Sequence, residues 1–350
     1  GGSVTATATV RVGAVPVIAS FAANPSWITT GGNAALSWSV SGASGVSIDA
    51  LGSVNGNSVQ VSPASDASYV LTASNEFGSA HAQATLSVFA PPKTWFAPFP
   101  PNLLPSYGAV DYLNLFSPTA PWTTAASHIQ VFKLYPYTLS LPDADLKNLF
   151  SDLRRRHIAV GLEQGGLMRV DNGSCAGDFD GNNALAYVQR IRDLGGSLQY
   201  VALDEPVFSA VVSTDSNACH WSVQQTVDNV ATTVAAMRSV FPDLVVGDIE
   251  PVAAGASNDT YLSTYLRRID AWKATTGKPF AFFHFDVAWG NDWKPAVLAL
   301  SRALRARQIP VGQIYIGLPD VTTDRAWVVS TESEMVDFEN HGSPAPDQVI

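Results

Sequence analysis

Hydrophobic and polar positions follow two different periods along the chain, and the change falls near Pro91-Pro92. Before this point, short segments alternate apolar with small polar residues, and turns rich in Gly, Asn, Ser and Pro separate them. Such alternation is typical of antiparallel strands. The segments cover residues 16–21, 35–40, 46–48, 58–61, 69–73 and 82–88. We therefore expect residues 13–91 to form an all-β sandwich of antiparallel strands.

Beyond residue 92, apolar runs of strand length alternate with amphipathic segments of helix length. The expected strands are 110–116, 129–135, 158–163, 198–204, 244–249, 280–286, 311–317 and 347–350. The expected helices are 142–156, 182–195, 222–240, 259–275, 293–308 and 325–339. Seven or eight β-α repeats in about 250 residues predict that 92–350 form one closed (β/α)8 TIM barrel. A doubly wound open sheet is the alternative, but no Gly-rich phosphate-binding motif follows the first expected strand. Because the chain stops inside the eighth expected strand, we expect the last helix of the barrel to be missing from it.

The N-terminal region also contains an internal repeat, since residues 2–12 align with residues 78–88 at the end of the expected sandwich. Residues 1–12 are therefore expected to be the last strand of a preceding module. The string Gly-Asn-Ala-Ala-Leu-Ser-Trp-Ser-Val-Ser-Gly-Ala (32–43), with Ser-Tyr-Val-Leu-Thr-Ala-Ser-Asn (68–75), resembles bacterial immunoglobulin-like modules of secreted and surface proteins. By this resemblance Tyr69 takes the place of their corner tyrosine. With the internal repeat, this predicts an array of such modules in a multimodular protein, and we expect the protein to be a monomer. The low charge and the Ser/Thr/Ala/Gly-rich composition of the N-terminal region favour a bacterial protein that is secreted or at the cell surface, with its signal sequence absent from this chain.

The composition limits the kinds of molecule that this protein is expected to bind. The chain has 350 residues, 46% of them hydrophobic and 14% charged, which indicates a globular protein. The formal net charge of −10 argues against a nucleic-acid partner, and no apolar stretch reaches the length of a membrane span. The two cysteines, Cys175 and Cys219, fall in loops that follow consecutive expected strands. Such loops lie side by side on one face of a barrel, so a disulfide is predicted, with two unrelated thiols as the alternative.

Two strings suggest the chemistry: Ala-Leu-Asp-Glu-Pro (202–206) and Gly-Asp-Ile-Glu-Pro (247–251). Each is an apolar run that ends in carboxylates, and an unpaired buried carboxylate costs several kcal/mol. The carboxyl ends of barrel strands are where active sites lie. Side chains two apart share a face, which pairs Asp248 with Glu250 and His284 with Asp286. The other expected strands bring further polar groups to the same end: Asn114, Lys133, Tyr135, Glu163 and Tyr315.

This collection of acids suits glycoside hydrolysis, which needs one protonated carboxylic acid and one ionised carboxylate. The string Leu-Asp-Glu-Pro resembles the Asn-Glu-Pro of the large retaining glycosidase barrel clan, which implies that Glu205 is the acid/base. Asp204 stands where the clan has asparagine, and the seventh expected strand lacks the clan's second glutamate. Glu250 is the first choice of partner, as in amylase-like barrels, which pair strands four and five. Asp286 is the second, as in galactosidase-like barrels, where strands four and six pair and Asp204 is the better nucleophile.

We therefore predict a glycosidase that cleaves a polysaccharide or oligosaccharide without a cofactor or metal. Trp122 and Trp289 follow expected strands, so loops at the barrel mouth would present their indoles to sugar rings. Two alternatives remain. One is a divalent-metal sugar isomerase or lyase that uses the same carboxylates and His284 as ligands. The other is a non-catalytic polysaccharide-binding protein. The predicted substrate-binding residues are Asn114, Trp122, Lys133, Glu163, Asp248, His284, Trp289 and Tyr315.

Overall fold

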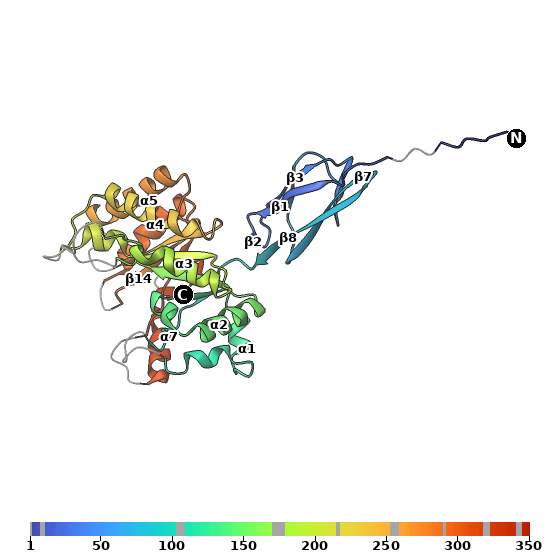
Figure 1. The fold of residues 1–350 in the computed structure, drawn as a ribbon. Coiled ribbons are helices and arrows are strands. Elements are labelled where there is room, and N and C mark those ends of the chain that lie inside the picture. Colours follow the sequence, from blue (N-terminus) through green and yellow to red (C-terminus); the bar gives the residue numbers. More distant parts are fainter. Residues whose placement is uncertain are drawn as a thin grey trace. The chain divides into compact units, whose positions relative to one another are not determined.

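The computed structural model divides the chain into two compact units, Gly1–Pro91 and Pro92–Ile350 (Figure 1). It describes residues 2–7, 11–102, 109–169, 179–214, 218–252, 259–289, 292–317, 323–340 and 345–350.

The first unit consists of two sheets around one core. A three-stranded sheet has the order β1-β3-β6, and a five-stranded sheet has the order β2-β8-β7-β4-β5. Buried Leu36 and Trp38 of the first sheet pack in the same cluster as Leu71 and Leu86 of the second. The strands are β1 (Val17–Asn24), β2 (Trp27–Thr29), β3 (Ala34–Ser41), β4 (Gly45–Ile48), β5 (Gly52–Ser53), β6 (Ser58–Val61), β7 (Ala67–Asn75) and β8 (Gly78–Phe89).

One strand of this unit departs from the expectation of a wholly antiparallel sandwich. β2 runs parallel to β8, so the five-stranded sheet is mixed. The described residues up to 16 form no strand, and the assignment of residues 1–12 to a preceding module stays a prediction. The immunoglobulin-like assignment of the unit also stays a prediction.

The second unit is an eight-stranded parallel sheet whose strands follow one another in chain order. The sheet closes, because the Val349 amide donates to the Lys93 carbonyl at 2.8 Å and Thr94 bridges Val349. This arrangement fits the predicted TIM barrel. The strands are β9 (Trp95–Phe96), β10 (Val131–Leu134), β11 (Ala159–Gln164), β12 (Tyr200–Asp204), β13 (Val245–Val252), β14 (Phe283–Val287), β15 (Val311–Gln313) and β16 (Gln348–Val349).

The first expected barrel strand, 110–116, is wrong. The first strand is the two-residue β9, and Tyr112–Phe116 form a short 3₁₀ helix, η1. The apolar run is helical because Tyr112 and Phe116, four residues apart, both pack edge-on against Phe132. The Tyr112 and Phe116 ring centroids also lie 5.6 Å apart, as residues one helical turn apart can, whereas four residues of strand span about 13 Å.

Helices lie between successive strands within a few residues of their expected positions, and α3, α4 and α5 pack side by side (Figure 1). In α2, Leu146, Leu149, Phe150 and Leu153 make one buried apolar face at helical spacing. No helix in the described ranges has the length and apolar character that crossing a membrane requires. The helices are α1 (Thr123–Ala126), α2 (Asp143–Arg155), α3 (Ala184–Asp193), α4 (Val223–Arg238), α5 (Asp259–Thr276), α6 (Lys294–Ala306) and α7 (Asp324–Asn340).

Aromatic rings fill the centre of the barrel. Trp95 of β9 contacts Tyr200, Phe282 and His284, with ring centroids 5.3, 5.1 and 4.9 Å apart. Three glycines face this aromatic plug, and a methyl group at any of them would overlap a ring: Gly161, Gly247 and Gly312. The barrel is therefore packed shut below its mouth, and a ligand can approach the strands only at their ends.

Candidate active site

Asp204 and Asp286 are inward-facing residues at the ends of two barrel strands. In the sheet register Asp204 neighbours Ile249, which neighbours His284, and His284 belongs to the aromatic plug. Residues paired across parallel strands point to the same side, and residues two apart share it. Asp204 and Asp286 therefore face the barrel interior at the carboxyl ends of β12 and β14, where TIM barrels carry their active sites.

Lys133 and Glu163 complete this inward group from β10 and β11. The Lys133 ammonium is buried and forms an ion pair with the half-buried Glu163 carboxylate. The charges of Glu163 and Lys133 act on both Asp204 and Asp286, in opposite directions. Four neighbouring or near-neighbouring strands thus bring together one cation and three carboxylates.

Burial is the main influence on the protonation of the two aspartates. Burial raises the pKa of Asp204 well above its ordinary value, and the charges of Glu163 and Glu205 raise it further. Burial also raises the pKa of Asp286, with Glu163 as the next cause. Lys133 lowers the pKa of both carboxyl groups. The site therefore favours a shared state in which one carboxyl keeps its proton and another is ionised.

Tyr135 also belongs to this group, as its place beside Lys133 on the second expected strand predicted, although the predicted site gave it no role. Its buried hydroxyl has a pKa raised well above 10 by burial and then by the charges of Glu163, Asp204 and Asp286. The Lys133 ammonium lies 5.3 Å from the centre of its ring. Tyr135 stands two residues after Lys133, and strand alternation places both on one face.

Glu205 lies beside this group rather than within it. Its backbone has a φ of 50°, a left-handed conformation that is uncommon for residues other than glycine. Its amide donates to the Ile249 carbonyl at 2.8 Å. Its half-buried carboxylate raises the pKa of Asp204 and, on α5, of Tyr261 and Tyr265. Glu205 is thus an electrostatic neighbour of Asp204 on the side of β13 and α5.

The predicted placement of Glu250 and Asp248 at the mouth is wrong. The register pairs Glu250 with Phe285 and Asp248 with Phe283, whose side chains belong to the core beneath the helices. Asp248 forms a buried ion pair with Arg268 of α5. Glu250 is 0% exposed, so a substrate at the mouth cannot reach it. Alternation along β13 does unite the two acids on one face, but that face is the outer one.

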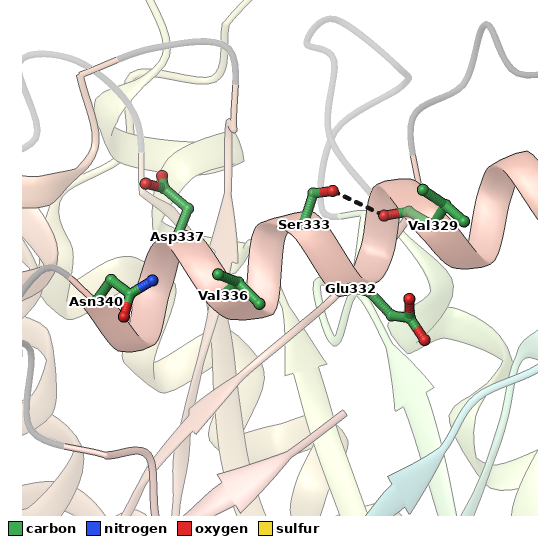
Figure 2. A pocket seen from close by; sticks show the side chains of 6 residues that line it. All are labelled: Val329, Glu332, Ser333, Val336, Asp337 and Asn340. Atoms are coloured by element: carbon green, nitrogen blue, oxygen red, sulfur yellow. Dashed lines mark hydrogen bonds between the residues drawn. The ribbon is translucent and has the colours of Figure 1, made fainter.

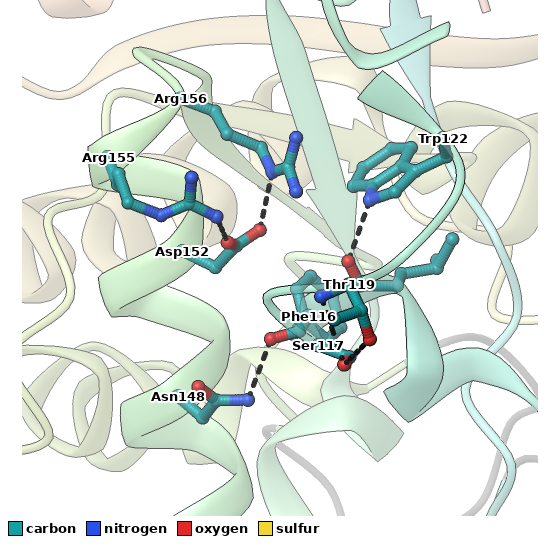
Figure 3. Close-up of polar contacts among 9 residues, drawn as sticks. Phe116, Ser117, Thr119, Trp122, Asn148, Asp152, Arg155 and Arg156 are labelled. Carbon is teal, nitrogen blue, oxygen red and sulfur yellow. Dashed lines mark hydrogen bonds and ion pairs between the residues drawn. The ribbon is translucent and has the colours of Figure 1, made fainter. Parts of the chain in front are cut away.

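Asn114 and Trp122 both lie in the segment between β9 and β10, and neither is on a barrel strand. Asn114 lies in η1 and not on a barrel strand. The Trp122 indole donates to the Leu115 carbonyl at 2.7 Å and lies 5.2 Å from the Arg156 guanidinium, on the helical layer (Figure 3). Arg156 in turn donates to Asp152 of α2 at 2.7 Å (Figure 3). Trp122 therefore packs helical segments together.

His284 faces inward, as predicted, but one layer deeper than Asp286. It is 0% exposed and its Nε2 lies 2.7 Å from the Gln348 side-chain oxygen. Burial lowers its pKa to about 3, which makes the ring neutral. Trp289 stacks on Tyr315 at 5.7 Å, and both pack against the core beneath α6 and α7. These positions give His284, Trp289 and Tyr315 a part in packing.

A shallow surface hollow follows α7 and is separate from the inward carboxylates. Its lining comes from one helix, and Ser333 donates to the Val329 carbonyl within it at 2.9 Å (Figure 2). One of the two carboxylates that line the hollow, Asp337, forms an ion pair with Lys294 at 3.2 Å. The lining residues are Val329, Glu332, Ser333, Val336, Asp337 and Asn340.

The cysteine prediction falls partly on residues that the structure does not describe. Cys175 lies outside the described residues, so the Cys175–Cys219 disulfide stays a prediction. Cys219 is half-buried and packs against the barrel core.

Several solved structures are similar to this chain, each at low sequence identity. A candidate alpha-galactosidase from Bacteroides fragilis has 11% identity and a TM-score of 0.33; 79% of this chain and 58% of that chain are covered. The GH53 catalytic domain of Ignisphaera aggregans has 12% identity and a TM-score of 0.43, with 73% of this chain and 79% of that chain covered. An HpcH/HpaI aldolase from Desulfitobacterium hafniense has 10% identity and a TM-score of 0.35, with 73% and 84% covered. No protein-family model and no curated protein matches the chain. Similarities this low assign it neither a family nor an activity.

Proposed function

We propose that the barrel hydrolyses glycosidic bonds, with Asp204 and Asp286 as its two working carboxylates. The observation that carries this proposal is their position: both face inward at the carboxyl ends of β12 and β14, and each has a raised pKa. Hydrolysis of a glycoside needs two such groups in different protonation states. Pairing strands four and six also fits the second of the two partner choices expected from the sequence.

The two aspartates take different roles in this proposal. Asp204, whose pKa burial raises furthest above the ordinary range, holds a proton and donates it to the leaving oxygen. Asp286, whose pKa is raised less, is ionised and acts as the nucleophile or as the base that activates water. This reverses the expectation that Asp204 is the nucleophile. The half-buried Glu163 carboxylate, which Lys133 holds by an ion pair, and the Tyr135 hydroxyl would bind sugar hydroxyl groups.

The positions of the candidate ligands favour hydrolysis over a metal-dependent isomerase or lyase. The Glu163 carboxylate already forms an ion pair with the Lys133 ammonium. His284 is turned to Gln348 below the mouth. Asp248 and Glu250 face the helices. Most groups that could have bound a divalent cation are thus engaged elsewhere.

We propose further that the protein acts outside the cell and carries its immunoglobulin-like unit as a spacer. The low density of charge in the first unit and the presence of two cysteines support this. A Cys175–Cys219 disulfide would tie together two loops of the barrel. Alkylation of the unreduced protein should then label neither cysteine, whereas labelling of both would refute the disulfide.

The experiment that tests the hydrolase is release of reducing ends from a panel of polysaccharides and oligosaccharides. Asp204→Asn and Asp286→Asn should each lower kcat by about 10²–10⁴-fold, the range of general acid-base catalysis. Asp337→Asn, on the outer surface of α7, is the matched control and should leave kcat unchanged. Full activity in either inward variant would refute the assignment. Loss of activity in EDTA would favour the metal enzyme, and glycan binding without turnover by the wild type would favour the binding protein.

A further inference from the structure

We propose that Glu250 is a positioning residue, whose buried carboxylate holds the turn that carries Asp204 and Glu205. The inference rests on the proposed function, because it assigns Glu250 a part in catalysis that it performs through Asp204. It replaces the expectation that Glu250 meets the substrate.

The contacts of Glu250 are with the backbone that follows the catalytic strand. Its Oε1 accepts the amide of Val207 at 2.8 Å, and its Oε2 accepts the amide of Phe208 at 3.0 Å. These two amides are consecutive and lie at the start of the helical segment η4 (Phe208–Val212). A single carboxylate therefore fixes both the position and the orientation of this stretch of backbone.

The turn that Glu250 holds is an unusual one. Glu205 adopts its left-handed φ of 50° directly between Asp204, the end of β12, and the segment that Glu250 binds. The Ile249 carbonyl, one residue before Glu250, accepts the Glu205 amide at 2.8 Å. β13 thus fastens the turn by its backbone at residue 249 and by its side chain at residue 250. Backbone in a sparsely populated conformation persists only where its surroundings hold it.

Burial of the Glu250 carboxylate is energetically unfavourable. Burial raises the pKa of Glu250 well above its ordinary value, the charge of Asp248 raises it further, and Arg268 and the two amides lower it. Both of its oxygens accept N–H groups, as those of an ionised carboxylate do. A neutral glutamine would avoid the desolvation of a charge but would leave one of the two amides of the turn without an acceptor, and an apolar side chain would leave both without one. Holding the turn is the role that accounts for a carboxylate at this position.

Glu250→Gln tests the inference, because it keeps the size of the side chain and replaces one acceptor oxygen with an NH₂ group. In the full chain, hydrogen exchange at the Val207 and Phe208 amides should become at least about tenfold faster. On the glycan that the wild type cleaves, kcat should fall by about 10²-fold, the effect of a misplacement of about 1 Å, while KM changes little. Asp347→Asn is the matched control, since the Asp347 carboxylate accepts the Val311 amide at 2.9 Å at the opposite end of the barrel.

Each outcome decides between positioning and general stability. Unchanged exchange at the two amides would overturn the inference, as would faster exchange with kcat unchanged. An equal loss of kcat in Asp347→Asn would assign the effect to stability and would also overturn it. If Glu250→Gln does not fold, Glu250→Asp keeps the charge and draws the oxygens away from the amides. Wild-type protein that cleaves no glycan would refute the proposed function, and the exchange rates alone would then decide whether Glu250 holds the turn.

Discussion

The buried ion pair between Asp248 and Arg268 offers a test of the structure that needs no substrate. Both side chains are 1% exposed, and the pair joins the outer face of β13 to α5. Within the described ranges, Asp248 Oδ1 and the Nε and Nη2 atoms of Arg268 have no hydrogen-bond partner. Arg268→Met keeps a long apolar stem and removes the charge. Asp248 and Glu250 would then remain buried without this neighbouring cation.

The expected cost follows from these contacts. Removal of one partner of a buried ion pair costs about 3–5 kcal/mol. The Arg268 guanidinium also lies 4.9 Å from the centre of the Phe280 ring, a contact worth about 0.5–2 kcal/mol. We therefore expect Arg268→Met to lower the free energy of unfolding by about 4 kcal/mol. The double variant Asp248→Leu/Arg268→Met removes both charges and all three unpaired atoms, and it should recover about 3 kcal/mol or more.

The sign of the pH dependence follows from the titration of Asp248. Burial raises its pKa to about 6 from the ordinary 3.8, so between these values the folded state binds more protons than the unfolded state. The stability contributed by this group therefore falls as pH rises through that window. Arg268 lowers the pKa of Asp248, so its removal extends the loss to higher pH. The cost of Arg268→Met should thus be larger at pH 8 than at pH 5.

Urea unfolding followed by tryptophan fluorescence at both pH values measures these quantities. The wild type, the two single variants and the double variant form a double-mutant cycle. A cost below about 1 kcal/mol for Arg268→Met would refute the buried pair. The same cost at both pH values would refute the titration argument. A double variant no more stable than Arg268→Met would show that the unpaired charge is not the cause of the lost stability.

Three further predictions concern the mouth and the aromatic plug. Glu205→Gln removes a negative charge that raises the pKa of Asp204, so the alkaline limb of the kcat profile should move to lower pH; an unmoved limb would contradict the acid role. Lys133→Met removes the charge that lowers the pKa of Asp286, so the acidic limb should move to higher pH, and a shift to lower pH would contradict the base role. Gly247→Ala places a methyl group into an aromatic ring and should cost about 1–3 kcal/mol in urea unfolding, whereas wild-type stability would refute the packing.

The alternation of strands and helices could be predicted because the two periods differ clearly in this sequence. Helix 142–156 is α2 at Asp143–Arg155, and helix 222–240 is α4 at Val223–Arg238. The first barrel strand could not be found in this way, because β9 has two residues and two residues show no period. The apolar run at 110–116 was the nearest segment of sufficient length. Its residues pack at the helical spacing of four, which a short run does not distinguish from alternation.

The face of β13 is where prediction of the site failed, and the reason is physical. Alternation shows that Asp248 and Glu250 share a face but not which face that is. The compensating cation, Arg268, stands twenty residues beyond Asp248 on α5, and its contact is visible only in the fold.

The sequence does hold one indication of the correct face, in the sizes of the residues that fill the barrel. The plug takes its rings from Trp95, Tyr200 and Phe282, and glycines on intervening strands make room for them. Gly247 is one of these glycines, so it must point inward. Its neighbours in the chain at positions 248 and 250 then point outward, towards the helices. The pairing of large rings with glycines inside the barrel thus shows which face of each strand points inward. That face, rather than the acids themselves, indicates which carboxylates reach the mouth.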